Sequence, residues 1–250
     1  MKLTENCYAV LGFGYYPPWL VNSGFIVGGA KTLIVDSGPN YISAQTIYGY
    51  AKNIKPGNEL IVINTEKHLD HIGGNSLFKE KGIKIFGHKD IHRNDSELND
   101  DKKYFNKSIL SAKRREAGEE EIFFQNTKII NPGFPVENNQ LFQLGGGLEA
   151  IIIYTYGHTS TNISVFVPTD KVLYCGDCIV SSYIPNLEAS NKDDWNIWLE
   201  SLNTIGKLDI SYIIPGHGKV LSGIEIIKEI ERLKNILKDA ICTGITPASE

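Results

Sequence analysis

The stretch Thr65-Glu66-Lys67-His68-Leu69-Asp70-His71-Ile72-Gly73-Gly74 directly follows the apolar segment 60–63, Leu-Ile-Val-Ile. It packs two carboxylates and two imidazoles into six residues, so one strand end presents four side chains that can bind metal ions. Three more such side chains follow apolar runs further along the chain, close to glycines: His158, Asp177 and His217. These seven positions predict a metal site built from loops at strand ends.

The order of the residues indicates more than one ion. Side chains alternate along an extended chain, so Glu66, His68 and Asp70 face the same way. The adjacent pair Asp70 and His71, placed in the turn that follows, can diverge toward two ions. A single ion would leave donors unused, whereas two ions would use them.

The opposing interpretation is that these residues only cap turns, where histidine and aspartate are common. However, four of the six histidines fall at the motif positions, each beside a glycine or a turn. This density favours metal binding. His88 and His92 lack such partners, and we interpret them as surface residues at the start of a helix.

The motif resembles that of the metallo-β-lactamase-fold hydrolases, whose hallmark is His-x-His-x-Asp-His followed by a distant His, Asp and His. The resemblance covers nearly the whole chain and implies an α+β fold, a four-layer αββα sandwich. It also implies a role for each position. One ion would be held by Glu66, His68 and His158, the other by Asp70, His71 and His217, with Asp177 bridging and Asp36 orienting a ligand.

The chain departs from the family pattern at Glu66, where the family normally has histidine. Against two divalent cations, the three carboxylates Glu66, Asp70 and Asp177 leave a formal charge of +1, whereas the histidine version leaves +2. A bound water should therefore be somewhat less acidified. We expect two divalent ions, with zinc favoured and with iron or manganese made more plausible by the added oxygen ligand.

Two similar hairpin signals predict two β-rich halves. Residues 23–29 with 31–36 form the first, residues 162–168 with 171–177 form the second, and each ends in an aspartate. Each sheet needs helices to cover it, and the active site would lie at the edge between the halves. Amphipathic patterns predict these helices over 41–54, 74–81, 193–208 and 223–237.

Two segments could touch a substrate. The aromatic loop 12–20 contains Tyr15, Tyr16 and Trp19, which form either an apolar wall for an acyl group or a plug packed on the sheet. The charged segment 88–126 lies between predicted strands near 83–86 and 128–130. It is interpreted as a helical insertion that forms a lid, a homodimer contact or solvated helices. We expect it to be anchored by aromatic residues, namely Tyr104, Phe105, Phe123 and Phe124.

Composition is consistent with one domain over residues 1–250. The net charge of −4 argues against nucleic-acid binding. The sequence has no run of 18 consecutive apolar residues, so membrane insertion is not expected. The first residues lack the apolar core of a signal peptide, so a cytoplasmic location is expected. The four cysteines do not suggest a disulfide framework, and Cys175 and Cys178 are expected to be reduced, with Cys178 close enough to Asp177 to lie near the metal.

These observations predict a metal-dependent hydrolase that attacks a small carboxylic ester, thioester, lactone or lactam with metal-activated hydroxide. Asp70 and Asp177 would orient that hydroxide, and no Gly-x-Ser-x-Gly sequence indicates a serine nucleophile. Three alternatives remain open. They are a mononuclear iron oxygenase of the same fold, a phosphodiesterase, and a degenerate member that only binds a metabolite.

Overall fold

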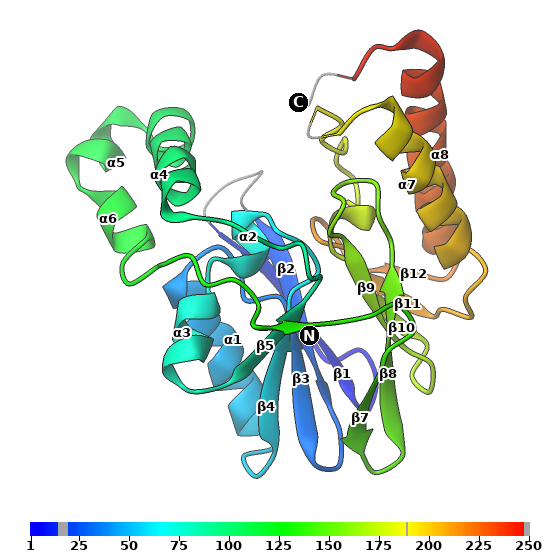
Figure 1. Cartoon of the computed structure of the whole chain (residues 1–250), viewed down its shortest axis with the longest axis horizontal. Helices are drawn as coiled ribbons and strands as arrows, with labels where there is room; N and C mark the ends of the chain where they lie inside the picture. Colours follow the sequence, from blue (N-terminus) through cyan, green and yellow to red (C-terminus); the bar gives the residue numbers. More distant parts are fainter. Residues whose placement is uncertain (15–19, 189, 248–250) are drawn as a thin grey trace.

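Two six-stranded β-sheets face each other in the computed structural model, which describes residues 1–14, 20–188 and 190–247 (Figure 1). The first sheet has the strand order β1-β2-β3-β4-β5-β6, and the second has the order β12-β11-β10-β9-β8-β7. The first comprises β1 (Cys7–Phe13), β2 (Val21–Val27), β3 (Lys31–Val35), β4 (Glu59–Ile63), β5 (Lys84–Gly87) and β6 (Phe134–Pro135). The second comprises β7 (Leu141–Gly145), β8 (Leu148–Tyr154), β9 (Ile163–Val167), β10 (Val172–Tyr174), β11 (Tyr212–Ile214) and β12 (Leu221–Ser222).

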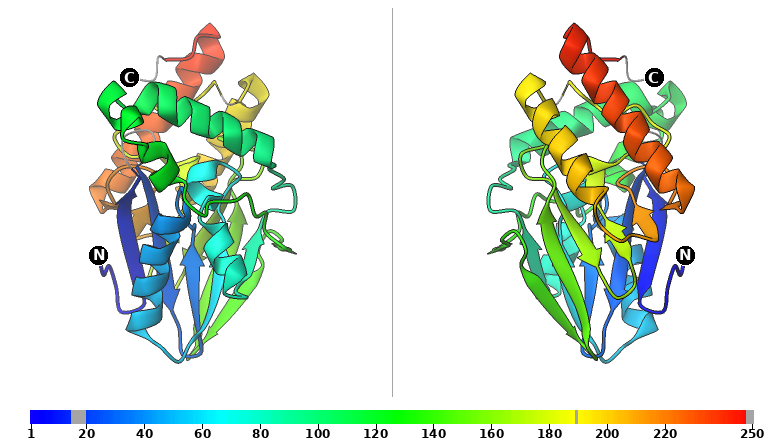
Figure 2. Two further views of the ribbon diagram at one scale, coloured as in Figure 1. Left: turned by 90° about the vertical axis from the view of Figure 1, so that its left-hand side faces the viewer. Right: turned by 90° about the vertical axis from the view of Figure 1, so that its right-hand side faces the viewer.

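Helices cover the outer face of each sheet, as the side views show (Figure 2). Helices α1 (Tyr41–Ile54) and α3 (Asn75–Glu80) share an apolar core with the first sheet, and α7 (Lys192–Ile205) and α8 (Ile224–Thr243) share one with the second. The predicted four-layer sandwich is therefore confirmed. The last helix runs six residues beyond its predicted end.

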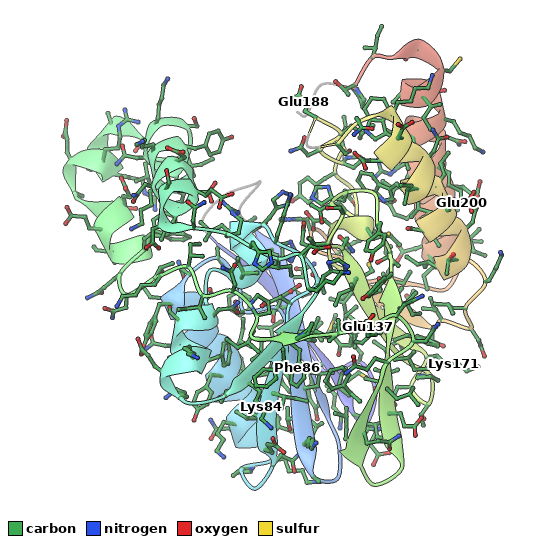
Figure 3. The ribbon with its side chains drawn as sticks, viewed as in Figure 1. Lys84, Phe86, Glu137, Lys171, Glu188 and Glu200 are labelled. Carbon is green, nitrogen blue, oxygen red and sulfur yellow. The ribbon has the colours of Figure 1, made fainter. Side chains whose placement is uncertain are left out.

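Buried apolar side chains from both sheets form the central layer. One contact between the sheets involves Phe86 of β5, the strand beside the edge strand β6 (Figure 3). Its ring packs edge-on against Phe142 of the edge strand β7, with centroids 5.0 Å apart. Both predicted hairpins exist, because β2 pairs antiparallel with β3 and β9 pairs antiparallel with β10. Asp36 directly follows β3, whereas Asp177 lies three residues after β10, in the short 3-10 helix η2 (Gly176–Cys178).

Three helices begin at an asparagine that caps the first turn. Asn40, Asn94 and Asn191 precede α1, α4 (Asp95–Tyr104) and α7, and each accepts a hydrogen bond from a backbone N–H of that turn. The third residue of each helix returns a bond to the cap, which completes a capping box. The first residue of each of these helices is thus determined by neighbouring residues in the sequence.

Two local predictions are wrong. Residues 128–130 form no strand, because the Ile130 carbonyl accepts a bond from Asn75 Nδ2 at 2.8 Å, and the chain joins the sheet only at β6. Tyr104 does not anchor the insertion, since 49% of it is exposed at the end of α4.

Tyr15, Tyr16 and Trp19 lie outside the described residues. No helix in the described ranges is both long and apolar enough to cross a membrane.

The two sheets are joined by backbone hydrogen bonds at the end away from the predicted site. Gly29 N–H donates to the Gly145 carbonyl and Ala30 N–H to the Leu144 carbonyl, each at 2.9 Å. A Cβ at the neighbouring Gly28 would overlap the Leu144 carbonyl, so this close approach requires glycine.

We therefore expect Gly28→Ala to lower the free energy of unfolding by about 1–3 kcal/mol, the usual cost of overpacking. Urea denaturation followed by circular dichroism measures this change. Gly49→Ala is the matched control, because a Cβ there meets nothing within 4 Å. Gly49 lies inside α1, so alanine should stabilise the protein by about 0.5–1 kcal/mol. Equal effects of the two variants would contradict the proposed tight contact between the sheets.

Candidate metal centre

The loop after β4 brings four donor side chains to the interface of the two sheets. Glu66 follows the strand directly, His68 precedes the short helix α2 (Leu69–Ile72), and Asp70 and His71 lie within that helix. The helical turn separates Asp70 from His71, which is how the adjacent residues reach different neighbours. The other three donors come from the second sheet. His158 follows β8, Asp177 follows β10 and His217 follows β11.

The first group of donors comprises Glu66, His68, His158 and Asp177. His68 Nδ1 lies 3.0 Å from Glu66 Oε2 and 3.1 Å from His158 Nε2. His158 Nε2 lies 3.5 Å from both Glu66 Oε1 and Asp177 Oδ2. Four potential ligand atoms from both halves of the chain therefore converge on one point.

The second group comprises Asp70, His71 and His217. His217 Nε2 lies 3.1 Å from Asp70 Oδ2, and His71 Nε2 lies 3.9 Å from the same oxygen. Asp177 faces this group as well, because its Oδ1 is 3.3 Å from His71 Nε2 and its Oδ2 is 3.3 Å from His217 Nε2. All seven predicted donors thus lie together, with Asp177 between the two groups.

The chemistry of these atoms fits divalent cations. Both carboxylate oxygens of Glu66, Nε2 of His71 and Oδ1 of Asp177 are buried without a hydrogen-bond partner, which is costly unless an ion satisfies them. For a metal–ligand bond of about 2.1 Å, the ligands at the corners of a tetrahedron are about 3.4 Å apart. The observed separations of 3.0–3.5 Å within the first group match that spacing.

Two acceptor groups set the orientation of the second-group imidazoles. Asp36 Oδ2 lies 2.9 Å from His71 Nδ1, and the Leu20 carbonyl lies 2.8 Å from His217 Nδ1. A carboxylate and a carbonyl can only accept, so each Nδ1 carries a proton and each Nε2 is directed at the centre. Asp36 is itself held by the backbone N–H and the hydroxyl of Thr65, both at 2.7 Å.

The charges at the centre depend on one another. Burial opposes ionisation of Asp177, but His217 and His71 outweigh it and hold the pKa of that carboxyl well below its usual range. Burial likewise disfavours charged imidazole, yet the carboxylates beside His71 and His217 raise the pKa of both well above the ordinary value. Without metal, protons therefore occupy nitrogens that an ion would need.

A family model described as the metallo-beta-lactamase superfamily matches residues 16–217, most of the chain. The chain belongs to this superfamily. Its members are generally metal-dependent hydrolases, and the two donor groups are candidate sites for divalent metal.

Individual proteins are similar to this chain in sequence or structure. "Beta-lactamase-like protein 2 homolog" of Caenorhabditis elegans is 29% identical over 230 residues, which cover 89% of this chain and 65% of that protein, so the chain spans less than two thirds of this relative. "Metallo-beta-lactamase type 2" of Bacillus cereus is 26% identical over 231 residues, covering 88% of this chain and 76% of the relative. The crystal structure of a metallo-beta-lactamase family protein from Thermus thermophilus superimposes with a TM-score of 0.70 at 16% identity, over 95% of this chain and 81% of that one. The last match concerns the fold alone.

The prediction that His88 is a surface residue is wrong, whereas His92 is exposed as expected. His88 is buried at the end of β5, and its Nε2 lies 2.8 Å from the Tyr156 hydroxyl. The Asp90 backbone N–H donates to His88 Nδ1 at 3.3 Å, so the neutral ring carries its proton on Nε2 and donates it to Tyr156. Burial also lowers the pKa of His88, which favours this neutral form.

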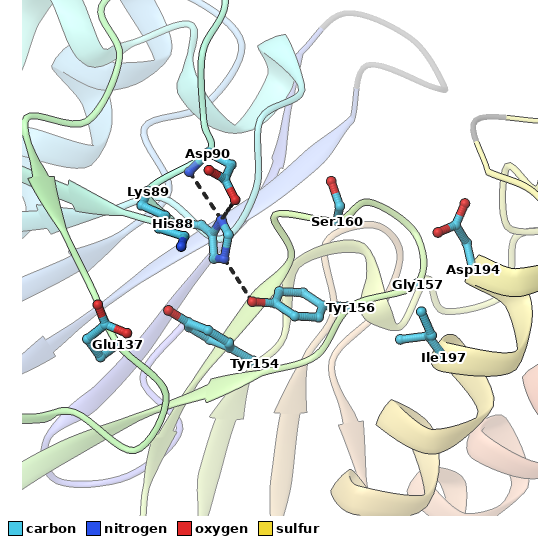
Figure 4. A pocket seen from close by; sticks show the side chains of 10 residues that line it. All are labelled: His88, Lys89, Asp90, Glu137, Tyr154, Tyr156, Gly157, Ser160, Asp194 and Ile197. Atoms are coloured by element: carbon cyan, nitrogen blue, oxygen red, sulfur yellow. Dashed lines mark hydrogen bonds and ion pairs between the residues drawn. The ribbon is translucent and has the colours of Figure 1, made fainter.

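His88 and Tyr156 line a cavity of about 350 Å³ (Figure 4). The cavity reaches Gly157, the residue before His158, and extends to Ile197 of α7. Because His88 donates to the Tyr156 oxygen, the Tyr156 proton remains available to a bound molecule. Burial raises the pKa of Tyr156 to about 12, so this proton is retained at neutral pH. The sequence offered one signal for this site, a histidine at a strand end.

The charged insertion is seated on the metal-binding loop. It comprises α4, the π-helical turn η1 (Phe105–Ile109), α5 (Ala112–Glu116) and α6 (Glu119–Phe123), and it stands above the first sheet (Figures 1 and 2). Leu69, which lies between two donors, is buried in one apolar cluster with Leu98, Phe105, Leu110 and Phe124. Of the predicted aromatic anchors, Phe105 and Phe124 are buried, and Phe123 is partly buried and packs against them. Arg93 joins the same elements, because it donates to the Lys67 carbonyl at 3.3 Å and pairs with Asp101 of α4 at 2.8 Å.

The cysteines lie outside both donor groups. All four are free thiols, among them Cys175 and Cys178, which were predicted to be reduced and are buried. Burial raises the pKa of Cys178 to about 12, so it remains a neutral thiol. Although Cys178 follows Asp177 in sequence, it belongs to neither donor group of the described residues.

We expect metal affinity to rise with pH. The raised pKa values of His71 and His217 mean that binding must displace protons, so each displaced proton contributes about tenfold in affinity per pH unit. Competition with a chromophoric zinc chelator between about pH 6 and pH 8 measures the dependence. Asp36→Asn should flatten it, because Asp36 contributes most to raising the pKa of His71. An affinity that is independent of pH would contradict the assignment of these histidines.

We also expect Leu98→Ala to weaken metal binding from a distance. Removing a buried leucine costs about 2–5 kcal/mol and loosens the cluster that holds Leu69 in place. Limited proteolysis of the insertion and chelator competition should both report the change. Ile122→Ala is the control, because Ile122 is 58% exposed on α6. Faster proteolysis with unchanged metal affinity would show that the insertion does not stabilise the metal loop.

Proposed function

We propose that the protein hydrolyses a small carboxylic ester, thioester, lactone or lactam with a pair of divalent metal ions. One observation carries the proposal. Two groups of nitrogen and oxygen donors meet at Asp177, and several of their atoms are buried without a partner. The centre is also open to water, because the side chains of His68, Asp70 and His217 are 31%, 16% and 12% exposed.

The donors divide between two ions in this proposal. Glu66, His68 and His158 would hold the first ion and Asp70, His71 and His217 the second, with Asp177 shared. Zinc suits this set of ligands, and the three carboxylates also suit manganese or iron. When bound, such a pair lowers the pKa of water and polarises a carbonyl group.

The protein side chains supply orientation. Asp36 and the Leu20 carbonyl keep Nε2 of His71 and His217 directed at the centre. Asp70 Oδ2 and Asp177 Oδ2 both lie within 3.3 Å of His217 Nε2, so two acceptor oxygens flank one point on the exposed side. They would accept hydrogen bonds from the attacking water and orient it toward the acyl carbon.

The cavity beside His158 would receive the part of the substrate that does not react. Its volume of about 350 Å³ suits a small molecule, and the Tyr156 hydroxyl offers one hydrogen bond there. Lactams are included in the substrate class because several relatives are named "Metallo-beta-lactamase type 2". Esters, thioesters and lactones share the same carbonyl chemistry.

A second candidate is a mononuclear iron oxygenase. Glu66, His68 and His158 form a carboxylate with two imidazoles, a donor set that open iron sites use. Elemental analysis separates the two proposals. Near two equivalents of zinc or manganese per chain favour the hydrolase, and one iron with oxygen consumption favours the oxygenase.

We expect Asp70→Asn and His217→Ala to lower hydrolysis by at least about 100-fold while the fold persists, because both remove donors of the second group. A panel of chromogenic esters, thioesters, lactones and lactams measures turnover, and circular dichroism reports folding. His92→Ala is the control, since His92 is an exposed histidine outside both groups. Unchanged turnover in either site variant would refute the proposed centre.

A further inference from the structure

Glu66 stands where the family pattern has a histidine. It is completely buried, and its oxygens lie near imidazoles of both donor groups. Oε2 lies 3.0 Å from His68 Nδ1 in the first group, whereas Oε1 lies 3.3 Å from His71 Nε2 in the second. Oε1 is also 3.5 Å from His158 Nε2. Glu66 therefore faces both groups, although the family pattern would give this position to one ion.

Asp177 makes a matching set of contacts. It approaches His71 Nε2 at 3.3 Å and His158 Nε2 at 3.5 Å, the same separations that Glu66 Oε1 shows to those nitrogens. The two carboxylates therefore both lie between one imidazole of the first group and one of the second. Neither Glu66 oxygen nor Asp177 Oδ1 has a hydrogen-bond partner.

The chemistry of the side chain explains what the replacement adds. An imidazole directs a single nitrogen lone pair at the centre and serves one ion, whereas a carboxylate has two oxygens with about four lone-pair sites and can serve two ions. A second shared carboxylate also places negative charge between two cations that repel each other. We propose that Glu66 is a second bridging ligand, so that two carboxylates join the paired metal ions.

This inference rests on the proposed two-metal centre and makes the binding of the two ions interdependent. Loss of Glu66 should weaken both ions, because each loses a shared oxygen. Asp70 provides a matched comparison. It is also a carboxylate of the centre, but its neighbours are His217 at 3.1 Å and His71 at 3.9 Å, both in the second group. Glu66→Gln and Asp70→Asn remove the same charge but differ in the number of ions they affect.

The test is manganese titration of the metal-free protein, followed by electron paramagnetic resonance. We expect the unaltered protein to bind two ions with a spin-coupled spectrum, in which the hyperfine spacing is half that of an isolated ion. Glu66→Gln should lower the affinity for both ions by about 10-fold to 100-fold and weaken the coupling. Asp70→Asn should lower one affinity only and keep the coupled signal at saturating manganese. Glu66→His should retain two ions but reduce their coupling, because imidazole cannot bridge through one nitrogen.

The outcomes separate this inference from the proposed function. Two bound ions whose coupling and affinities are unchanged in Glu66→His would overturn the bridge and leave the two-metal hydrolase intact. Loss of only one affinity in Glu66→Gln, as in Asp70→Asn, would also overturn the bridge. Fewer than two ions in the unaltered protein would overturn both proposals. Circular dichroism of each metal-free variant shows whether it is folded before titration.

Discussion

Burial of charge at the junction of the two sheets is the constraint on which this structure depends. Glu66, His71 and Asp177 are withdrawn from water, and several of their polar atoms have no hydrogen-bond partner. Such groups are unfavourable unless opposite charges or a cation compensate them. The close pairing of three carboxylates with four imidazoles supplies part of this compensation, and divalent ions would supply the rest. The fold must therefore fix the positions of the two sheets relative to each other at this edge, because both supply donors.

The two hairpins meet that requirement in related ways. Each delivers an aspartate just beyond its second strand, Asp36 from the first sheet and Asp177 from the second. The two residues nevertheless act differently. Asp36 adopts a left-handed backbone conformation, with φ of 62°, and bonds the outer nitrogen of His71, whereas Asp177 faces the inner nitrogen of the same ring. One imidazole is thus held from both sides by equivalent ends of the two halves.

Much of this arrangement could be predicted from the sequence because its signals are local. The hairpin signals and the amphipathic patterns predicted two β-rich halves covered by helices, and the family resemblance implied the four-layer sandwich. The dense motif at 66–71 and the later His158, Asp177 and His217 predicted the seven donors. Contacts between distant segments could not be predicted in the same way. The burial of His88 depends on Tyr156, which is 68 residues away in the sequence. The hydrogen bond from Asn75 to the Ile130 carbonyl occurs where local composition favoured a strand over residues 128–130. The contact of Glu66 with His71 depends on the turn of α2, since alternation along an extended chain would separate them.

The seating of Leu69 limits how separable the helical insertion is. Its apolar cluster is completed by a residue that lies outside the insertion, in the middle of the metal motif. Recombination at the borders of 88–126 would move the helices but leave this residue behind. Insertions could be exchanged among relatives only where the recipient loop presents an apolar side chain of matching size, so the two segments would be expected to evolve as a single unit. A chimaera without such a side chain would lose the order of the loop at 66–71 before its sheets unfold.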